Sequence, residues 1–433
     1  MSSLRILIVG AGGREHALAW TLARSSSVTQ IYVAPGNAGT IWDQAASCAP
    51  SSNVAIAVED ISALVAFAQR EQIDLTVIGP EVPLSLGIVD AFRNAGLRAF
   101  GPTQAAAQLE ASKAFSKAFM QRHSIPTAAY GDFDDYEAAC DFVEHFDKPV
   151  VVKADGLAAG KGVIVCDTPD QARAALAQIM LEREFGAAGN RVVIEERLSG
   201  AEISALAFCD GTNVAMMPLA RDHKRIFDGD QGPNTGGMGA FAPVLDVPPD
   251  FVETIQRSVI EPTIRGMAEE GTPYVGVLFA GLMLTPDGVK VLEFNCRFGD
   301  PETEVILPLL DADFAEILLA CTEGHLKQHL PDWRQETCAT VVLASPGYPG
   351  NYPKALPIFG LDRQTDNVIV FHAGTTFKDA EVVTAGGRVL AVSGKGDSLA
   401  SALACAYRHI ETIQFEGMQY RRDIGRISEG MTR

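Results

Sequence analysis

This 433-residue sequence has few basic residues relative to acidic ones, no closely spaced cysteine pairs and no long hydrophobic runs. Its 54 acidic residues outnumber its 35 lysines and arginines, which gives a formal net charge of −19. This balance argues against a sequence-independent nucleic-acid surface, because such a surface needs a basic face. It also disfavours attraction to anionic lipid. We therefore expect no nucleic-acid or membrane partner, and we expect any bound phosphate to be held by a few local cations and backbone amides.

The eight cysteines form no C-x-x-C pair and have no zinc-site spacing. Reduced, mostly buried thiols are therefore expected, as is typical of the cytosol. The apolar run at residues 4–9 is too short for a secretion signal. No run reaches the ~20 apolar residues that cross a bilayer. The sequence thus predicts a cytoplasmic protein.

Strand and helix patterns alternate over the first hundred residues. Buried strands are expected at 4–9, 30–34, 74–78 and 98–100, and helices at 15–24, 61–70 and 88–95. This series predicts a doubly wound parallel sheet in an N-terminal domain of residues 1–108. Thr103 is a plausible N-cap for one helix that runs toward Met120.

The remaining chain predicts a mixed α/β and α+β multidomain architecture. A central domain is expected over residues 109–330. Within it, a small α+β lid subdomain is expected at about 125–195, with a strand hairpin around a glycine loop and a helix near 170–184. Residues 331–433 predict a C-terminal mixed α/β domain, which includes the basic stretch Tyr420-Arg421-Arg422-Asp423.

The first glycine loop predicts an anion site. Gly12 and Gly13 stand between a strand and a helix, where free amides and the helix dipole favour phosphate. A nicotinamide-dinucleotide fingerprint would need glycine in place of Glu15 and an acid after the second strand, and both are missing. Asn37 and Glu81 follow neighbouring strands and could bind ribose hydroxyls. A purely structural turn is the alternative interpretation.

The second glycine loop, at residues 156–162, follows a valine-rich strand that ends in Lys153. Such a strand aims Lys153 rigidly, and the loop could fold over phosphates with Lys161 adding a charge. It is not a P-loop, because Gly162 stands where Ser or Thr is required. A solvated surface lysine is the alternative, although a lysine among valines is costly to bury without a partner.

Two further strand ends carry polar groups. The stretch 195–198 offers backbone groups that could read adenine, and Glu202 could accept both ribose hydroxyls. Glu293, Asn295 and Arg297 alternate along one strand and should share a face. Carboxylate and amide oxygens suit Mg²⁺, whose remaining ligands would be phosphates and water. An acidic strand end and a solvent-facing edge strand are the alternatives.

Together these motifs resemble the ATP-grasp superfamily. The resemblance rests on the strand lysine with its glycine loop, on Glu-Glu-x-Leu-x-Gly-x-Glu at 195–202 and on Glu-x-Asn-x-Arg at 293–297. Further stretches resemble the glycinamide ribonucleotide synthetase family essentially from end to end. They lie at 12–16, 36–40, 153–162, 222–225, 232–240, 292–302 and 420–425.

The resemblance implies a ligase of de novo purine synthesis that joins glycine to 5-phosphoribosylamine. ATP would be converted to ADP and phosphate through glycyl phosphate, with Mg²⁺ or Mn²⁺ bound, and a monomer is the expected state. For ATP, the implied residues are Lys113, Lys153, Gly160, Lys161, Glu195, Leu198 and Glu202, with Glu293 and Asn295 on the metal and Arg297 on the transferred phosphate. For phosphoribosylamine they are Gly12, Gly13, Asn37 and Glu81, and for the glycine and acyl-phosphate site Asp222, Lys224, Asn234, Gly236 and Gly237. Arg297, Lys153, Asp222 and Lys224 are the candidate catalytic residues.

One departure from the superfamily leaves the number of metal ions open. Many ATP-grasp enzymes carry a second carboxylate on the strand before the metal strand, but residues 280–284 offer none. Another ATP-grasp carboxylate–amine ligase is the alternative function. A nicotinamide oxidoreductase is disfavoured by Glu15, and a non-catalytic nucleotide sensor is disfavoured because each phosphate and metal motif keeps its chemical group.

Overall fold

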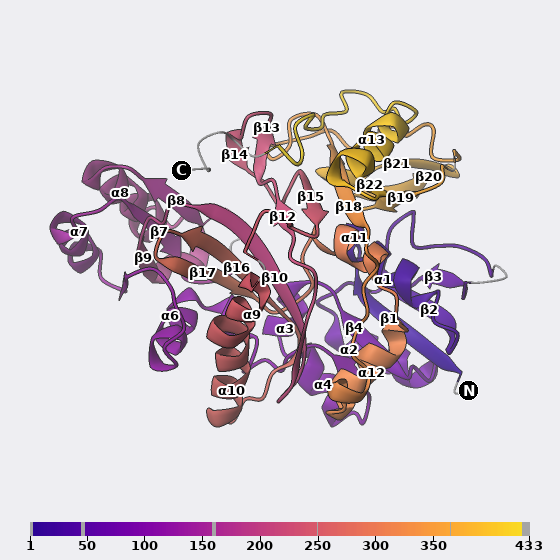
Figure 1. The fold of residues 1–433 in the computed structure, drawn as a ribbon, viewed down its shortest axis with the longest axis horizontal. Helices are drawn as coiled ribbons and strands as arrows, with labels where there is room; N and C mark the ends of the chain where they lie inside the picture. The colour runs from indigo at the N-terminus through magenta and orange to yellow at the C-terminus, as the bar shows by residue number, and fades with distance from the viewer. Residues whose placement is uncertain (1–2, 45–47, 158–161, 249, 364, 427–433) are drawn as a thin grey trace.

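The computed structural model describes residues 3–44, 48–157, 162–248, 250–363 and 365–426. Figure 1 shows the N-terminal sheet at the right, the lid helices α7 and α8 at the far left, and the C-terminal helix α13 at the top. Two long strands, β10 and β16, cross the centre between them. Among the helices of the described ranges, none combines the length and the hydropathy that a bilayer crossing requires.

The N-terminal sheet is parallel throughout, in the order β3-β2-β1-β4-β5. Its first strand is apolar on both faces, because Ile6 and Ile8 enter one core cluster whereas Leu7 and Val9 enter another. The predicted doubly wound sheet is thereby confirmed. Its strands are β1 Leu4–Gly10, β2 Val28–Pro35, β3 Ser51–Asn53, β4 Leu75–Ile78 and β5 Ala99–Phe100, and its helices are α1 Gly13–Leu22, α2 Ile61–Arg70, α3 Glu81–Ser85 and α4 Ile88–Asn94.

The prediction of one helix from Thr103 toward Met120 is wrong. The structure has two helices, α5 (Gln108–Ala111) and α6 (Lys113–Arg122), with Ser112 in an extended conformation between them. The Ser112 hydroxyl accepts from the amide of Phe115 and lies 3.0 Å from the Asp155 carboxylate. This capping by a side chain outcompetes helix continuation, since Ser favours N-caps over helix interiors.

The lid is an antiparallel sheet in the order β6-β9-β7-β8, with its own apolar core beneath two helices. The predicted hairpin of β7 and β8 is confirmed, with Lys153 paired to Val163. The helix expected near 170–184 is shorter, because it changes to a π-helical turn at Ala177–Leu181. The elements are β6 Tyr130–Phe133, α7 Tyr136–His145, β7 Val150–Ala154, β8 Val163–Cys166, α8 Pro169–Leu176 and β9 Val192–Glu196.

The central sheet is antiparallel, in the order β11-β10-β16-β17. A bulge interrupts the β16–β17 ladder, because Gly281 pairs with Glu293 whereas Leu282 pairs with Val291. Leu292 is therefore the extra residue, and such bulges re-aim nearby side chains. The elements are β10 Ala201–Asp210, β11 Val214–Met216, β16 Val275–Thr285, β17 Gly288–Asn295, α9 Phe251–Ile255, α10 Glu261–Glu269, α11 Thr303–Ile306 and α12 Phe314–Glu323.

The third large sheet joins residues from both sides of position 330, in the order β12-β15-β18-β22-β19. Sequence reasoning missed this pairing, and the boundaries 1–108, 109–330 and 331–433 remain predictions. The strands are β12 Arg221–Asp222, β15 Gly239–Ala242, β18 Thr337–Ala344, β19 Val368–His372 and β22 Arg388–Gly396, covered by α13 Leu399–Ile410. Two separate hairpins are β13 Arg225–Phe227 with β14 Gln231–Asn234, and β20 Thr375–Lys378 with β21 Glu381–Thr384.

Candidate active site

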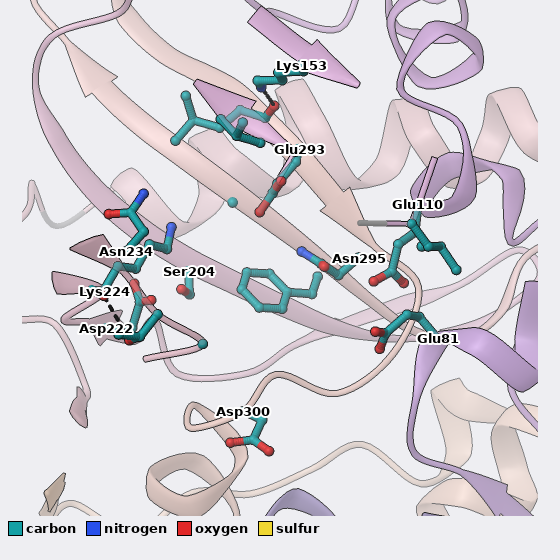
Figure 2. Close-up of a pocket in the computed structure, with 18 of the residues that line it drawn as sticks. Glu81, Glu110, Lys153, Ser204, Asp222, Lys224, Asn234, Glu293, Asn295 and Asp300 are labelled. Carbon is teal, nitrogen blue, oxygen red and sulfur yellow. Dashed lines mark hydrogen bonds between the residues drawn. The ribbon is translucent and has the colours of Figure 1, made fainter. Parts of the chain in front are cut away.

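A cleft of about 1650 Å³ lies where the lid, the central sheet, the edge of the N-terminal sheet and residues 348–354 meet. Pockets for one small ligand usually occupy ~300–1,000 Å³, so this cleft has room for more than one substrate. Twelve of the candidate residues line it: Glu81, Lys113, Lys153, Glu195, Glu202, Asp222, Lys224, Asn234, Gly236, Glu293, Asn295 and Arg297. Figure 2 shows Glu293 between Lys153 on one side and Asn295 on the other.

A buried carboxylate between two lysines forms one end of the cleft. Glu195 is 3% exposed, and its oxygens lie 2.6 Å from Lys153 Nζ and 2.8 Å from Lys117 Nζ. Burial alone would raise the pKa of Glu195, but the two lysines lower it. Burial lowers the pKa of Lys117 to about 8, despite the opposing effect of Glu195.

Lys117 was missed from the sequence, although it lies four residues after Lys113 and therefore on the same side of α6. Lys113 Nζ donates to the carbonyl of Gly156 at the start of the glycine loop. Burial lowers the pKa of Lys113, and Glu293 opposes that effect. Three ammonium groups thus converge where the ATP phosphates are expected.

Of the three residues predicted to share a strand face, Glu293 and Asn295 lie on one face of β17, whereas Arg297 comes after the strand has ended. The bulge at Leu292 lies next to Glu293, and the Leu292 carbonyl accepts from Lys153 Nζ at 3.2 Å. Among the described residues, the Glu293 carboxylate has no hydrogen-bond or ion-pair partner. Burial would raise its pKa, but Lys224 and Lys153 lower it. An ionised carboxylate facing the cleft beside an amide oxygen fits a hard divalent cation.

The facing strand explains why the cleft lacks a second carboxylate at this point. Gly281 stands opposite Glu293, and no group of three acidic, His or Cys side chains suited to a metal occurs in the described ranges. A cation held here would therefore take its other ligands from phosphate oxygens and water.

Arg297 follows the end of β17 and is held by two carboxylates. Its guanidinium lies 3.1 Å from Glu110 and 3.2 Å from Glu81, and it donates to the amide oxygen of Asn295. Burial lowers the pKa of Arg297, but the two glutamates outweigh this and raise it. Glu110 was not found from the sequence, because its role depends on Arg297, which is far from it in the chain.

Asp222 and Lys224 flank the cleft from another side. Lys224 Nζ lies 2.6 Å from the Glu202 carboxylate, which was expected to bind ribose. Burial raises the pKa of Asp222 to about 7, even though Lys224 opposes the shift. A carboxyl group that titrates near neutral pH inside a cleft is a candidate for proton transfer.

The remaining candidates lie outside the residues that line the cleft, or cannot be placed. Leu198 is half-buried, and Gly237 has a φ of +110° and packs against Pro301. Gly160 and Lys161 lie outside the described residues.

The space beside the loop at Gly12 and Gly13 is occupied by the side chain of Glu15, from the helix that follows the loop. Glu15, 2% exposed, accepts from the amide of Gly12 and forms an ion pair with Arg14. A Cβ atom at Gly79 would lie 1.9 Å from the Glu15 carboxylate, so that glycine makes room for it.

Asn37 is also engaged within the protein. Its amide nitrogen donates to the carbonyls of Ala11 and His372, which ties the N-terminal sheet to β19. Its binding of phosphoribosylamine stays a prediction, as does that of Gly12 and Gly13.

Further polar residues of the cleft were not found from the sequence. Ser204 donates to Glu302 at 2.9 Å, and Arg388 lies 2.9 Å from Asp300. Tyr348 accepts from the amide of Gly236 at 3.2 Å, so the C-terminal region closes the cleft beside the 222–236 segment.

A lid sheet and a central sheet define an ATP-grasp ligase when they enclose lysines, the acidic stretch 195–202 that joins β9 to β10, and the Glu293–Asn295 oxygen pair. Models of the phosphoribosylglycinamide synthetase N domain, ATP-grasp domain and C domain match residues 4–110, 111–303 and 338–427. The chain belongs to the phosphoribosylglycinamide synthetase family, so the resemblance seen in the sequence is confirmed.

Curated relatives agree with this assignment. The chain is 51% identical to phosphoribosylamine–glycine ligase of Vibrio vulnificus, over 98% of each protein. It is 53% identical to the human trifunctional purine biosynthetic protein adenosine-3, over 97% of this chain. The chain spans only 42% of that trifunctional protein.

Solved structures extend the comparison. A phosphoribosylamine–glycine ligase from Thermotoga maritima superposes with a TM-score of 0.83 at 34% identity, covering 97% of this chain and 100% of that one. The biotin carboxylase domain of the Hydrogenobacter thermophilus 2-oxoglutarate carboxylase has a TM-score of 0.76 at 15% identity, over 97% and 92%. At that identity the likeness concerns the fold alone.

Proposed function

We propose that the chain joins glycine to 5-phosphoribosylamine in purine (IMP) biosynthesis and converts ATP to ADP and phosphate. The observation that carries the proposal is that one cleft holds the lysine cluster, the Glu293–Asn295 oxygen pair and the 222–236 segment. Its volume suits several substrates at once. The names of relatives about 50% identical over nearly their whole length supply the substrates.

The first step is attack by a glycine carboxylate oxygen on the γ-phosphorus, which breaks the bond to ADP and gives glycyl phosphate. Phosphoryl transfer needs in-line positioning and neutralisation of charge more than covalent help from the protein. Lys113, Lys117 and Lys153 supply positive charge at the phosphate end. Glu293 and Asn295 would hold Mg²⁺ or Mn²⁺, which when bound neutralises phosphate charge.

In the second step the phosphoribosylamine nitrogen attacks the glycyl carbonyl carbon, and inorganic phosphate leaves. The attacking amine must lose a proton. Asp222 titrates near pH 7 and is the candidate acceptor. Leu157 and Val163 line the cleft from the lid, and apolar cover of this kind protects an acyl phosphate from water.

The test is an ADP-release assay in which the supply of phosphoribosylamine is switched on and off with glycine present. ADP should form only when both substrates are present. Glycine labelled with ¹⁸O in its carboxylate should pass one label to inorganic phosphate. ADP release with a different carboxylate and amine would instead support another ATP-grasp ligase, and unlabelled phosphate would exclude the glycyl phosphate step.

The choice between Mg²⁺ and Mn²⁺, the monomeric state and the cytoplasmic location remain predictions. Size-exclusion chromatography with light scattering decides the oligomeric state. Activity of metal-stripped protein with each cation added back decides the metal.

A further inference from the structure

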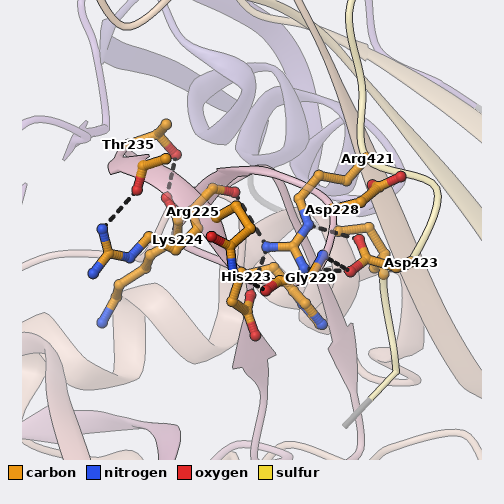
Figure 3. Close-up of polar contacts among 12 residues, drawn as sticks. His223, Lys224, Arg225, Asp228, Gly229, Thr235, Arg421 and Asp423 are labelled. Carbon is orange, nitrogen blue, oxygen red and sulfur yellow. Dashed lines mark hydrogen bonds and ion pairs between the residues drawn. The ribbon is translucent and has the colours of Figure 1, made fainter. Parts of the chain in front are cut away.

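The stretch Tyr420-Arg421-Arg422-Asp423 has no part in the proposed reaction, yet it packs against the ribbon formed by β13 and β14 (Figure 3). Arg421 is 1% exposed and is the largest fully buried side chain of the described residues. Burying an arginine is costly unless its charge is paired. The burial of this charge against the ribbon therefore indicates a structural role for Arg421.

The ribbon depends on support from outside itself. Strands β13 and β14 pair only with each other in the described structure, and residues 227–234 are exposed. A two-stranded hairpin alone is marginally stable in water. The base of this ribbon lies in the cleft, because Lys224 precedes β13, and Asn234, which pairs with Arg225, ends β14.

Arg421 clamps the ribbon at both its turn and its base. Its Nη1 atom donates to Asp230 at 2.7 Å and to the carbonyl of Arg225 at 3.2 Å. Its other nitrogens form two 2.8 Å hydrogen bonds to the Asp423 carboxylate, which also accepts from the amide of Gly229 at 2.7 Å. The guanidinium thus ties two points of the hairpin to the C-terminal segment directly, and a third through Asp423.

Neighbouring contacts strengthen the same connection. Burial would raise the pKa of Asp423, but hydrogen bonds from Arg421 and the Gly229 amide bring it down to about 2. Two residues further on, the amide of Gly425 donates to His223 at 3.1 Å. His223 directly precedes Lys224, so this second tie also acts at the base of the ribbon.

We propose that Arg421 is a positioning residue, which holds Lys224 and Asn234 in the cleft by clamping the ribbon that carries them. The inference rests on the proposed function, in which the 222–236 segment lines the glycine and acyl-phosphate site. The ATP end of the cleft is built from other elements, which carry Lys113 and Lys153. Loss of the clamp should therefore act mainly on the glycine side, and it reaches the ATP end only through the contact of Lys224 with Glu202.

Two variants weaken the clamp from opposite ends. Arg421→Lys keeps the charge, but a lysine cannot make the forked contacts of a guanidinium. Asp230→Asn removes the charge at the turn, where φ is +54°, and Asn tolerates this conformation as well as Asp does. Arg422→Gln is the matched control, because the Arg422 side chain is exposed and lies over the Tyr420 ring instead of the ribbon.

In steady-state assays, both clamp variants should lower kcat about 10- to 100-fold, since a displacement of ~1 Å can cost ~10²-fold. The KM for glycine should rise more than the KM for ATP, which the clamp reaches only through Lys224 and Glu202. Arg422→Gln should match wild type throughout. If the KM for ATP rises as much as the KM for glycine, or if neither changes, the positioning role is refuted.

Amide hydrogen exchange provides a readout independent of activity. Exchange over residues 225–234 should accelerate in both clamp variants and not in Arg422→Gln. Unchanged exchange would refute the clamp, whatever reaction the enzyme performs. A wild-type protein inactive with glycine and phosphoribosylamine would count against the proposed function alone. Should Arg421→Lys fail to fold, Asp230→Asn, which alters a partly exposed side chain, decides the question.

Discussion

The Glu195→Gln substitution tests the electrostatics of the lysine cluster directly. It would leave the Lys117 and Lys153 ammonium groups buried without the carboxylate that separates them. Removing one partner of a buried ion pair costs ~3–5 kcal/mol in general. Here the cost is limited, because Lys117 can lose its proton and so avoid being a buried, unpaired charge.

The free-energy cost of deprotonating Lys117 follows from its pKa, which is about 8 in the folded protein. One pKa unit corresponds to ~1.4 kcal/mol, so neutralising Lys117 at pH 7 costs ~1.4 kcal/mol. Loss of the charge-assisted hydrogen bond to Lys153 adds ~1.5 kcal/mol or more. We expect Glu195→Gln to lose ~3 kcal/mol of unfolding free energy at pH 7.

The loss should shrink as the pH rises. The folded-state pKa of Lys117 lies below its unfolded value, so above pH 8 the unfolded chain holds more protons and stability rises with pH. Without Glu195 that pKa falls further, and the rise begins at lower pH. The difference between wild type and variant should therefore narrow by ~1.4 kcal/mol from pH 7 to pH 9.

Urea unfolding followed by far-ultraviolet circular dichroism at pH 7, 8 and 9 measures this difference. Glu196→Gln is the matched control, because Glu196 is the next residue on β9 and pairs with the exposed Lys148. A surface pair of this kind contributes ~1 kcal/mol or less. A Glu195→Gln loss no larger than the control, or one constant from pH 7 to pH 9, would refute the reasoning.

Three further substitutions test other parts of the structure. Glu293→Gln should lower turnover at saturating Mg²⁺ by ~100-fold or more, because phosphate charge is neutralised less well. The affinity for phosphoribosylamine should stay within twofold of wild type, and near-wild-type turnover would contradict the metal assignment. Gly237→Ala should lower the unfolding free energy by more than ~1 kcal/mol, because the new Cβ would lie 2.4 Å from Pro301. Gly271 also has a positive φ but faces open space, so Gly271→Ala should lower the unfolding free energy by less. Glu304 is buried without a hydrogen-bond partner among the described residues, and burial raises its pKa well above the ordinary value. The folded protein therefore keeps a proton on Glu304 that the unfolded chain releases, so the wild-type unfolding free energy falls by up to ~1.4 kcal/mol per pH unit above the unfolded pKa. In urea titrations, Glu304→Gln should be more stable than wild type at pH 8 but not at pH 4.

Local geometry explains which parts of the site could be predicted from the sequence. A strand alternates its side chains with a period of two, so the shared face of Glu293 and Asn295 follows from their spacing. The valine-rich strand likewise indicates that Lys153 is held rigidly where the strand ends. Such residues depend on their neighbours in the chain, and those neighbours are visible in the sequence.

Residues whose role depends on distant partners could not be predicted. The role of Lys117 depends on Glu195, which β9 brings against it, and the role of Glu110 depends on Arg297, which follows the end of β17. The bulge at Leu292 likewise exists only through the register of β17 against β16. These features are set by tertiary packing, which local patterns do not encode.

The first glycine loop shows how a correct physical principle can leave its ligand open. Glycines before a helix allow close approach of an anion, and the helix dipole favours negative charge. In this fold the Glu15 carboxylate already occupies that position at the amide of Gly12, with Gly79 leaving room for it. The same glycine pattern therefore serves an internal anion, and a substrate phosphate at this loop would share the helix end with that carboxylate.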